Sequence, residues 1–520
     1  MLLIIVLVVL TVSVSIFVKS KYSESNTVET EEIALIPKPL NYEVGEGEFI
    51  LTEDTSIYVM GNSSEETEEV YKVAEFIRDK FRPSTGFELD IIKSDDVPPG
   101  NIYLTTLGGE ENKGNEGYQI VTTEEGVKLV GNKAEGLFRA VQTLRQLLPS
   151  SIEKRTLVTD VEWKIPFSTI KDSPEYGYRG LMIDVARHFF TVDEIKRQID
   201  FASQYKINKI HMHLSNDQGW RLEIKKWPNL TIKGGSTEVG GGSGGYYTQE
   251  DFKELVRYAS ERYIEVIPEF DMPGHTNAAL ASYGFLNENG RESALYMGID
   301  IGFSTLMCRD EKTYEFIEDI IKEVVEISPS QYIHIGGDEA NSTEKSDYDY
   351  FIGRVTKLVE KYGKTPIGWD PAGTVPEISE NFILQNWSDS NKWTNQKNLK
   401  KIISIAGKTY LDMKYKEGSD YGLVWAGFNP IEDAYKWDPT DYAPKDEVIG
   451  IEAPLWSETI INSKAMDYMI YPRLLGHAEI GWSTKESRIW EDYRNRLKFH
   501  AMRMKNQGIE YYSDPEIYNK

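Results

Sequence analysis

The chain has 520 residues, long enough for two or three domains, and its 40% hydrophobic and 12% aromatic content can fill large cores and argues against extensive disorder. Its formal net charge of -25 argues against nucleic acid or anionic membranes as partners, because such a surface repels both. Cys308 is the single cysteine, which excludes an internal disulfide and a cysteine-based metal cluster.

The N-terminal residues 2–18 are uncharged and mostly apolar, which predicts an export segment. The run is shorter than the ~20 residues of a membrane span, and Ser13 and Ser15 form a small-x-small cleavage pattern. We therefore predict a signal peptide at residues 1–20, with an uncleaved anchor as the alternative, followed by an acidic linker at 21–35. The protein is expected to be exported: secreted or extracytoplasmic, or membrane-anchored if the segment is not cleaved.

Residues 36–172 predict a small α/β domain. Short apolar stretches at 49–52, 56–60, 102–105, 117–122 and 126–130 are typical of strands. Residues 67–81 and 136–148 have helical periodicity, and the second places Leu137, Val141, Leu144 and Leu147 on one face. The segment contains no obvious acid-base cluster, so we expect it to have a structural role.

From residue 173 to the C-terminus the pattern changes to alternating strands and helices. Helices are expected at 192–205, 249–262 and 312–326, between eight candidate strands at 181–185, 209–214, 264–269, 332–335, 366–369, 383–387, 402–405 and 448–453. Such repeats over about 250 residues or more predict a parallel (β/α)8 TIM-type barrel, with a doubly wound sheet as the alternative. In a barrel, chemistry is expected at the carboxyl ends of the strands.

The fourth of these strands ends in two adjacent acids. Gly336 and Gly337 allow a sharp turn after the strand, and Asp338 and Glu339 follow at once. Like charges this close raise each other's pKa, an arrangement that proteins keep mainly where chemistry needs it. The run from residue 334 to 339, His-Ile-Gly-Gly-Asp-Glu, resembles the signature of the β-N-acetylhexosaminidases, glycoside hydrolase family 20.

The resemblance implies a mechanism that suits adjacent carboxylates. Asp338 and Glu339 cannot flank one glycosidic bond from opposite faces, so the usual pair of separate carboxylates is not available. In this family the sugar's own 2-acetamido oxygen attacks instead, and the resemblance implies an exo-acting retaining glycosidase specific for terminal β-linked GlcNAc or GalNAc. It makes Glu339 the general acid and then base, and makes Asp338 the group that holds the acetamido N–H and stabilises the oxazolinium-like intermediate.

Two further segments resemble family motifs at other strand ends. Residues 179–190 resemble the first strand and its exit, and there Arg187 matches the arginine that fixes the sugar 3- and 4-hydroxyls. A planar guanidinium suits paired hydroxyls. Residues 268–275 resemble the end of the third strand, which makes His275 the histidine that contacts the general acid and Asp271 an acid beneath it.

Aromatic residues follow the later strands, and the resemblance gives them sugar-binding roles. It makes Trp369, Trp387 and Trp456 a box around the acetamido methyl and the sugar face. Tyr410 would bond the acetamido oxygen. Two acids complete the implied binding set, with the 6-hydroxyl taken by Asp412 and the 4-hydroxyl by Glu458.

One position departs from the family pattern. The family often has two acids where this sequence has Asn216-Asp217, and the first is expected to orient the imidazole that corresponds to His275. Asparagine can accept a hydrogen bond but cannot stabilise an imidazolium by charge. We therefore expect either a neutral His275 or Asp271 in the orienting role, with an altered pH optimum.

Three other functions stay open at this point. His211-x-His213 on a strand fits a metal-dependent hydrolase, although the remaining histidines are scattered along the sequence. The Asn216 position fits a sugar-binding protein with lost catalysis, and loop lengths leave room for a disaccharide-releasing relative. We expect no cofactor and no metal, β-N-acetylhexosaminide glycans as ligands, and no protein partner, with homodimerisation left open.

Overall fold

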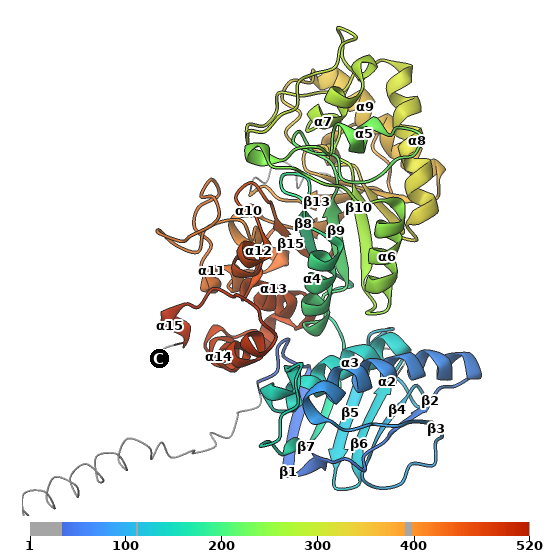
Figure 1. The fold of residues 1–520 in the computed structure, drawn as a ribbon, viewed down its shortest axis with the longest axis vertical. Helices are drawn as coiled ribbons and strands as arrows, with labels where there is room; N and C mark the ends of the chain where they lie inside the picture. Colours follow the sequence, from blue (N-terminus) through green and yellow to red (C-terminus); the bar gives the residue numbers. More distant parts are fainter. Residues whose placement is uncertain (1–33, 111–112, 390–397, 519–520) are drawn as a thin grey trace, which may run out of the picture. The chain divides into compact units, whose positions relative to one another are not determined.

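The computed structural model describes residues 34–110, 113–389 and 398–518 (Figure 1). The predicted signal peptide or anchor and nearly all of the predicted linker lie outside these residues. Among the helices of the described part, none combines the length and the apolar character that a bilayer crossing requires.

The small domain is a seven-stranded mixed sheet with order β1-β7-β5-β6-β4-β2-β3. Helices α2 (Ser64–Thr85) and α3 (Ala134–Leu147) pack against it, and Figure 1 shows them on the side of the sheet that faces the barrel. The strands are β1 (Asn41–Leu51), β2 (Ile57–Met60), β3 (Ile91–Lys93), β4 (Asn101–Thr105), β5 (Tyr118–Thr123), β6 (Gly126–Gly131) and β7 (Trp163–Asp172).

Eight parallel strands close the barrel in chain order, from β8 round to β15. They are β8 (Tyr178–Asp184), β9 (Lys209–His213), β10 (Glu265–Glu269), β11 (Tyr332–His334), β12 (Thr365–Trp369), β13 (Ile383–Asn386), β14 (Lys400–Ile403) and β15 (Val448–Leu455). Each matches one of the eight predicted strands, with an offset of two residues for β14. The predicted TIM-type barrel preceded by a small α/β domain is confirmed, and the doubly wound alternative is wrong.

Helices cover the barrel and its ends. The predicted ones are α4 (Val192–Gln204), α6 (Gln249–Ser260) and α8 (Glu311–Ile327), and the capping boxes Thr191–Glu194 and Thr248–Asp251 fix where the first two begin. The others are α5 (Asn229–Ile232), α7 (Asn277–Ser282), α9 (Lys345–Lys361), α10 (Ala406–Thr409), α11 (Ile431–Tyr435), α12 (Ser463–Ile470), α13 (Arg473–Trp482), α14 (Trp490–Asn506) and α15 (Pro515–Tyr518).

Every second residue of each strand points into the barrel, and these inward side chains form three layers. An apolar group closes the bottom: Tyr178, Ile267, Ile367, Ile383 and Ile402. Above it, the fully buried middle is ionic: His211, Glu269, His334 and Glu452. At the carboxyl ends of the strands an aromatic-rich group begins, with Met182, Trp369, Tyr410 and Trp456. The aromatic end is where the predicted sugar-binding residues lie.

A buried ion cluster joins the small domain to the barrel. Glu116, just before β5, lies 2.8 Å from Nε of Arg139 in α3 and contacts the guanidinium of Arg179 in β8. Burial disfavours the Glu116 carboxylate, but Arg179 and Arg139 outweigh burial and lower its pKa to about 2. The cluster therefore stabilises the fold above pH 4.5, and we expect this contribution to disappear as pH falls from 4.5 towards 2.

Replacing Glu116 by glutamine is expected to destabilise the protein by about 3–5 kcal/mol, because Arg179 would stay buried without its counter-ion and Arg139 would keep only the more distant Glu135. The measurement is thermal unfolding at pH 7 and at pH 3. The decrease in melting temperature relative to the unmodified chain should be large at pH 7 and smaller at pH 3. Lys164→Gln, which removes exposed ion pairs on β7 with Glu48 and Glu162, is the control. Equal melting temperatures for Glu116→Gln and the unmodified chain at pH 7 would contradict this account.

Candidate active site

A cavity of about 340 Å³ opens at the carboxyl ends of the barrel strands. Its walls bring together most of the predicted site residues, namely Arg187, Asp338, Glu339, Trp387, Tyr410, Trp456 and Glu458. Four residues that the sequence did not single out complete the lining: Ile299, Ile301, Leu423 and Trp425. The other predicted residues, Asp271, His275, Trp369 and Asp412, are buried outside this set of lining residues.

The two adjacent acids reach the cavity through a strained turn. After β11, Gly336 and Gly337 have φ of 67° and 101°, and a Cβ at Gly336 would lie only 1.8 Å from Asp271 Oδ1. Glu339 also has a positive φ of 46°, which is rare for a residue with a side chain. The glycines are therefore required by both conformation and space. Strain of this kind collects at functional sites.

Behind Glu339 lies a buried line of polar groups. Nε2 of His275 is 3.2 Å from Glu339 Oε2, and Nδ1 is 3.5 Å from Asp217 Oδ2. Asp217 Oδ1 accepts hydrogen bonds from the Asn277 backbone N–H at 2.9 Å and from the Ser304 hydroxyl at 2.5 Å. Burial alone would lower the pKa of His275, but the carboxylates around it, Asp271 and Asp217 foremost, raise it well above its usual value.

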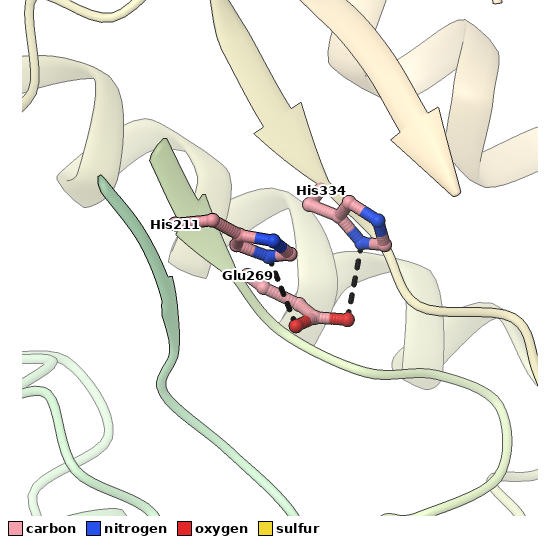
Figure 2. A group of neighbouring side chains, drawn as sticks. All are labelled: His211, Glu269 and His334. Atoms are coloured by element: carbon pink, nitrogen blue, oxygen red, sulfur yellow. Dashed lines mark ion pairs between the residues drawn. The ribbon is translucent and has the colours of Figure 1, made fainter. Parts of the chain in front are cut away.

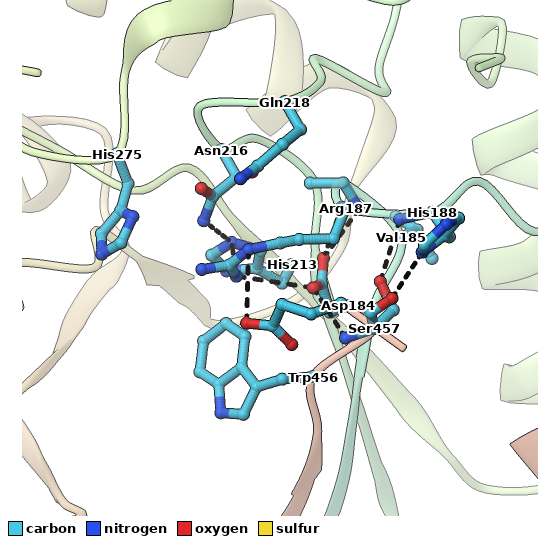
Figure 3. A network of polar contacts seen from close by, with 12 residues as sticks. Asp184, Val185, Arg187, His188, His213, Asn216, Gln218, His275, Trp456 and Ser457 are labelled. Carbon is cyan, nitrogen blue, oxygen red and sulfur yellow. Dashed lines mark hydrogen bonds and ion pairs between the residues drawn. The ribbon is translucent and has the colours of Figure 1, made fainter. Parts of the chain in front are cut away.

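The contacts of His275 correct the expectation that its orienting acid is lost at Asn216. The acid that pairs with His275 is Asp217, the next residue, so neither a neutral His275 nor an orienting role for Asp271 is needed. Asn216 instead donates from Nδ2 to Nε2 of His213, at 2.8 Å. Figure 3 shows its amide directed at His213, with His275 standing apart. Consecutive residues of an extended segment point to opposite sides, and the sequence prediction chose the wrong one of the pair.

Asp271 lies beside Asp338 rather than against the cavity. Its Oδ1 accepts the Gly337 backbone N–H at 3.0 Å. Burial, and then the charge of Asp338, raise the pKa of Asp271 well above its usual value. Burial also raises the pKa of Asp338, so this buried pair disfavours two full charges side by side. The predicted substrate-binding residue Asp271 is thus placed to support Asp338.

Aromatic rings form one wall of the cavity. Trp456 lies 5.7 Å from Trp369 and 6.2 Å from Tyr410, and Trp425 lies 5.7 Å from Tyr410 and 6.1 Å from Trp387, all between ring centroids. Hydrogen bonds fix two of the rings: Trp387 Nε1 donates to the Asp370 carbonyl at 2.8 Å, and Trp369 Nε1 donates to Glu269 Oε1 at 2.7 Å. Trp369 is fully buried and supports Trp456 from below.

The far end of the cavity is polar. The Arg187 guanidinium lies 4.8 Å from the Trp456 ring centroid, and its Nε lies 3.9 Å from Glu458 Oε1. Burial works against the charge of Arg187, but Asp184 and Glu458 raise its pKa. Within the described part of the chain, buried atoms without a hydrogen-bond partner include Arg187 Nε, Asp338 Oδ1, Asp412 Oδ2 and Glu458 Oε2. Unpaired polar atoms are costly when buried, so this end suits a ligand with several hydroxyls.

The His211-x-His213 pair is not an open metal site. His334, distant in the sequence, joins the pair in space, because its ring stacks on that of His211 with 4.6 Å between ring centroids (Figure 2). Nitrogen atoms of both rings lie 3.0–3.1 Å from Glu269 oxygens. Burial would lower the pKa of His211, but Glu452 and Glu269 raise it to about 10. A metal ion at His211 would have to displace that proton, and this cluster lies below the cavity without lining it.

A cavity at the strand ends of a TIM-type barrel, with paired acids and sugar-compatible walls, defines a glycoside hydrolase. Comparison with known families agrees. Residues 176–485 match the glycosyl hydrolase family 20 catalytic domain, and residues 32–173 match domain 2 of the same family. The chain belongs to glycosyl hydrolase family 20, as its resemblance to the β-N-acetylhexosaminidases predicted.

Individual relatives match over nearly their whole length. A β-N-acetylhexosaminidase of Cellulomonas fimi is 34% identical over 495 residues, covering 94% of this chain and 97% of that protein. A family 20 β-N-acetylhexosaminidase structure from Streptomyces coelicolor has a TM-score of 0.89 and 44% identity, covering 93% of this chain and 98% of the other. A mutant Streptomyces plicatus β-hexosaminidase in complex with its product GlcNAc has a TM-score of 0.88 and 43% identity, covering 93% of this chain and 97% of the other.

Proposed function

We propose that the protein is an exo-acting, retaining β-N-acetylhexosaminidase, which hydrolyses terminal non-reducing β-linked GlcNAc or GalNAc with the substrate's acetamido oxygen as nucleophile. The observation that carries this is the placement of Asp338 and Glu339 on one side of an aromatic-walled cavity. The remaining acid in the lining, Glu458, faces Arg187. Among the described residues that line the cavity, no second carboxylate is therefore free to attack the sugar from the opposite face.

In the proposed first step, the Glu339 carboxylic acid protonates the leaving glycosidic oxygen while the acetamido oxygen attacks the anomeric carbon. The glycosidic bond breaks, and a cyclic oxazolinium intermediate forms. Asp338 accepts the acetamido N–H and offsets the positive charge, which costs little because the carboxylate is already fixed. Water then adds to the anomeric carbon, and the bond from that carbon to the acetamido oxygen breaks. The water gives its proton to Glu339, which restores the acid, the acetamido group and the β-configuration of the released sugar.

The other residues bind the sugar in this proposal. Tyr410 donates to the acetamido oxygen, and the rings of Trp369, Trp387 and Trp456 enclose the acetamido methyl and the sugar face. Hydroxyl groups at positions 3, 4 and 6 are taken by Arg187, Glu458 and Asp412. The aglycone leaves through the mouth between Trp425 and the side chains of Ile299 and Ile301.

A panel of 4-nitrophenyl glycosides tests the proposal. We expect turnover of the β-GlcNAc and β-GalNAc glycosides, far slower turnover of the β-glucoside, which has no acetamido group, and inhibition by a thiazoline mimic of the cyclic intermediate. Release of lacto-N-biose as an intact disaccharide would instead support the disaccharide-releasing alternative. No turnover of any N-acetylated glycoside by folded protein would contradict the proposal.

Replacing Asp217 by asparagine is expected to lower kcat/KM by about 10²-fold or more, because a triad histidine needs its carboxylate for both orientation and charge. Asp217 raises the pKa of His275, so its removal should lower that pKa. The imidazolium is then lost at lower pH, and the alkaline limb of the kcat/KM profile should move towards acid. Ser304→Ala removes a hydrogen bond from Asp217 without its charge and should leave the limb in place. An unshifted limb in Asp217→Asn would count against this role.

We also propose that the protein is exported by its N-terminal apolar segment, residues 2–18. Support comes from the sequence of that segment, which is uncharged and is followed by Lys19 and Lys21. Fractionation of expressing cells, with mass spectrometry of the mature N-terminus, tests this. Cleavage near residue 20 supports a signal peptide, an intact segment in the membrane fraction supports an anchor, and full-length protein in the cytosol would overturn the proposal.

A further inference from the structure

A buried chain of hydrogen bonds connects the barrel interior to Arg187. Glu269 Oε2 lies 2.5 Å from His213 Nδ1, and Nε2 on the other side of that ring lies 3.3 Å from NH1 of Arg187 and 2.8 Å from Nδ2 of Asn216 (Figure 3). His213, Asn216 and Glu269 are each 1% exposed or less, and none of them lines the cavity. The chain reaches the cavity through Arg187, and the His213 ring also packs edge-on against Trp456, with 4.9 Å between ring centroids.

The orientation of the Asn216 amide follows from its backbone neighbour. The Asp217 backbone N–H donates to Asn216 Oδ1 at 2.7 Å, so this atom is the oxygen and the NH₂ group faces His213. The guanidinium of Arg187 carries only donors. Nε2 of His213 thus faces two donors, and it can accept from them only if it carries no proton.

The other side of the ring completes the assignment. An ionised carboxylate has only acceptor oxygens. Glu269 accepts from the Trp369 indole N–H at 2.7 Å, and it presents its other oxygen to Nδ1 of His213. The proton of a neutral His213 therefore lies on Nδ1, directed at Glu269. Other charges around the ring are Arg187, Asp184 and Glu458, and a second proton on His213 would face the guanidinium directly.

We propose that His213 and Asn216 are positioning residues that hold the Arg187 guanidinium towards the substrate hydroxyls, by keeping Nε2 of His213 a hydrogen-bond acceptor. The inference rests on the proposed function, since it adds a determinant to the same sugar site. The contacts of Arg187 with its own neighbours are long, at 3.4 Å to Asp184 Oδ2 and 3.9 Å to Glu458 Oε1. At 3.3 Å the His213 contact is comparable with the Asp184 contact, so the two together hold the guanidinium beside the Trp456 ring.

Two replacements of His213 distinguish the roles of its two nitrogen atoms. His213→Asn places a donor near Nδ1 but leaves no acceptor for Arg187, whereas His213→Gln places its amide oxygen near Nε2. We expect His213→Asn to lower kcat/KM on 4-nitrophenyl β-GlcNAc by about 10- to 100-fold, the worth of one hydrogen bond to a charged group. The loss should appear mainly in KM, and His213→Gln should recover most of it.

A substrate change tests the route through Arg187. A 4-deoxy β-GlcNAc glycoside lacks a hydroxyl that Arg187 and Glu458 would hold, so the unmodified protein should lose affinity for it. His213→Asn should be nearly indifferent to this deletion. An equal loss from the deletion in both proteins would overturn the inference. His477→Asn, a buried histidine of α13 outside the cavity lining, controls for loss of a buried ring.

A third variant tests the role of the amide. In Asn216→Asp the new carboxylate can accept a hydrogen bond from Nε2, which would turn that nitrogen into a donor facing Arg187. We expect KM for 4-nitrophenyl β-GlcNAc to rise, and a KM identical to that of the unmodified protein would overturn the assignment of the amide. Calorimetry with the product GlcNAc measures the affinity of the site without turnover. Absence of turnover in the unmodified protein would count against the proposed function, whereas normal turnover with unaffected variants would count against this inference alone.

Discussion

Replacing Glu339 by glutamine is expected to lower kcat/KM for a disaccharide by at least about 10²- to 10⁴-fold, the usual worth of a general acid-base. Glutamine keeps the shape of the side chain and the possibility of a hydrogen bond with His275, but it has no proton of suitable acidity to give. Binding of product GlcNAc should change little, since Glu339 acts on the leaving oxygen rather than on the sugar hydroxyls. The loss should therefore lie in kcat.

Comparing glycosides with good and poor leaving groups tests this prediction most directly. A 2,4-dinitrophenyl leaving group needs little protonation, so Glu339→Gln should lose much less activity on that glycoside than on a disaccharide. Glu344→Gln is the matched control, because it makes the same change five residues later at an exposed position. A loss of the same size for good and poor leaving groups would mean that Glu339 does not act as the acid.

The barrel was predictable because its strands carry their own signal. The strands combine apolar or alternating residues, and in those that carry the site the functional residue follows within four residues, as Asp338 follows β11 and Trp387 follows β13. The prediction of the small domain was less complete, because two of its strands were missed. β3 is three residues long and largely exposed, and β7 carries Pro166 and several polar residues, so neither resembled a strand. Their place depends on pairing with β2, β1 and β5 rather than on local pattern.

The site residues that sequence reasoning missed depend on loop conformation. Ile299, Ile301 and Trp425 are about half exposed, at 51%, 46% and 55%, in long segments without regular structure. Periodicity says nothing about such segments, although exposed large apolar residues are a signal once the fold is known. Asn216 and Asp217 illustrate a second limit: resemblance identified the pair, but only the path of the chain decides which side chain faces His275. His334 meets His211 through strand packing across more than a hundred residues.

Replacing Asp338 by asparagine is expected to lower kcat/KM on N-acetylated substrates by about 10²- to 10³-fold, the loss typical when one preorganised electrostatic contact to the transition state is removed. The amide of asparagine can still accept the acetamido N–H, but it cannot offset the positive charge of the oxazolinium. The effect should be confined to substrates that use this route. On the β-glucoside, which has no acetamido group, any residual turnover should fall much less.

The neighbouring acid provides the control. Asp271 contacts the Gly337 backbone outside the cavity lining, so Asp271→Asn, which keeps an acceptor there, should cost far less activity than Asp338→Asn. Affinity for the thiazoline inhibitor should fall with Asp338→Asn and stay nearly unchanged with Asp271→Asn. Mass spectrometry can contradict this prediction. A sugar covalently bound to Asp338 in the unmodified protein would make that carboxylate the nucleophile. The acetamido group would then be a binding handle only, and the charge on Asp338 would have to be explained by direct attack rather than by stabilisation of a cyclic cation.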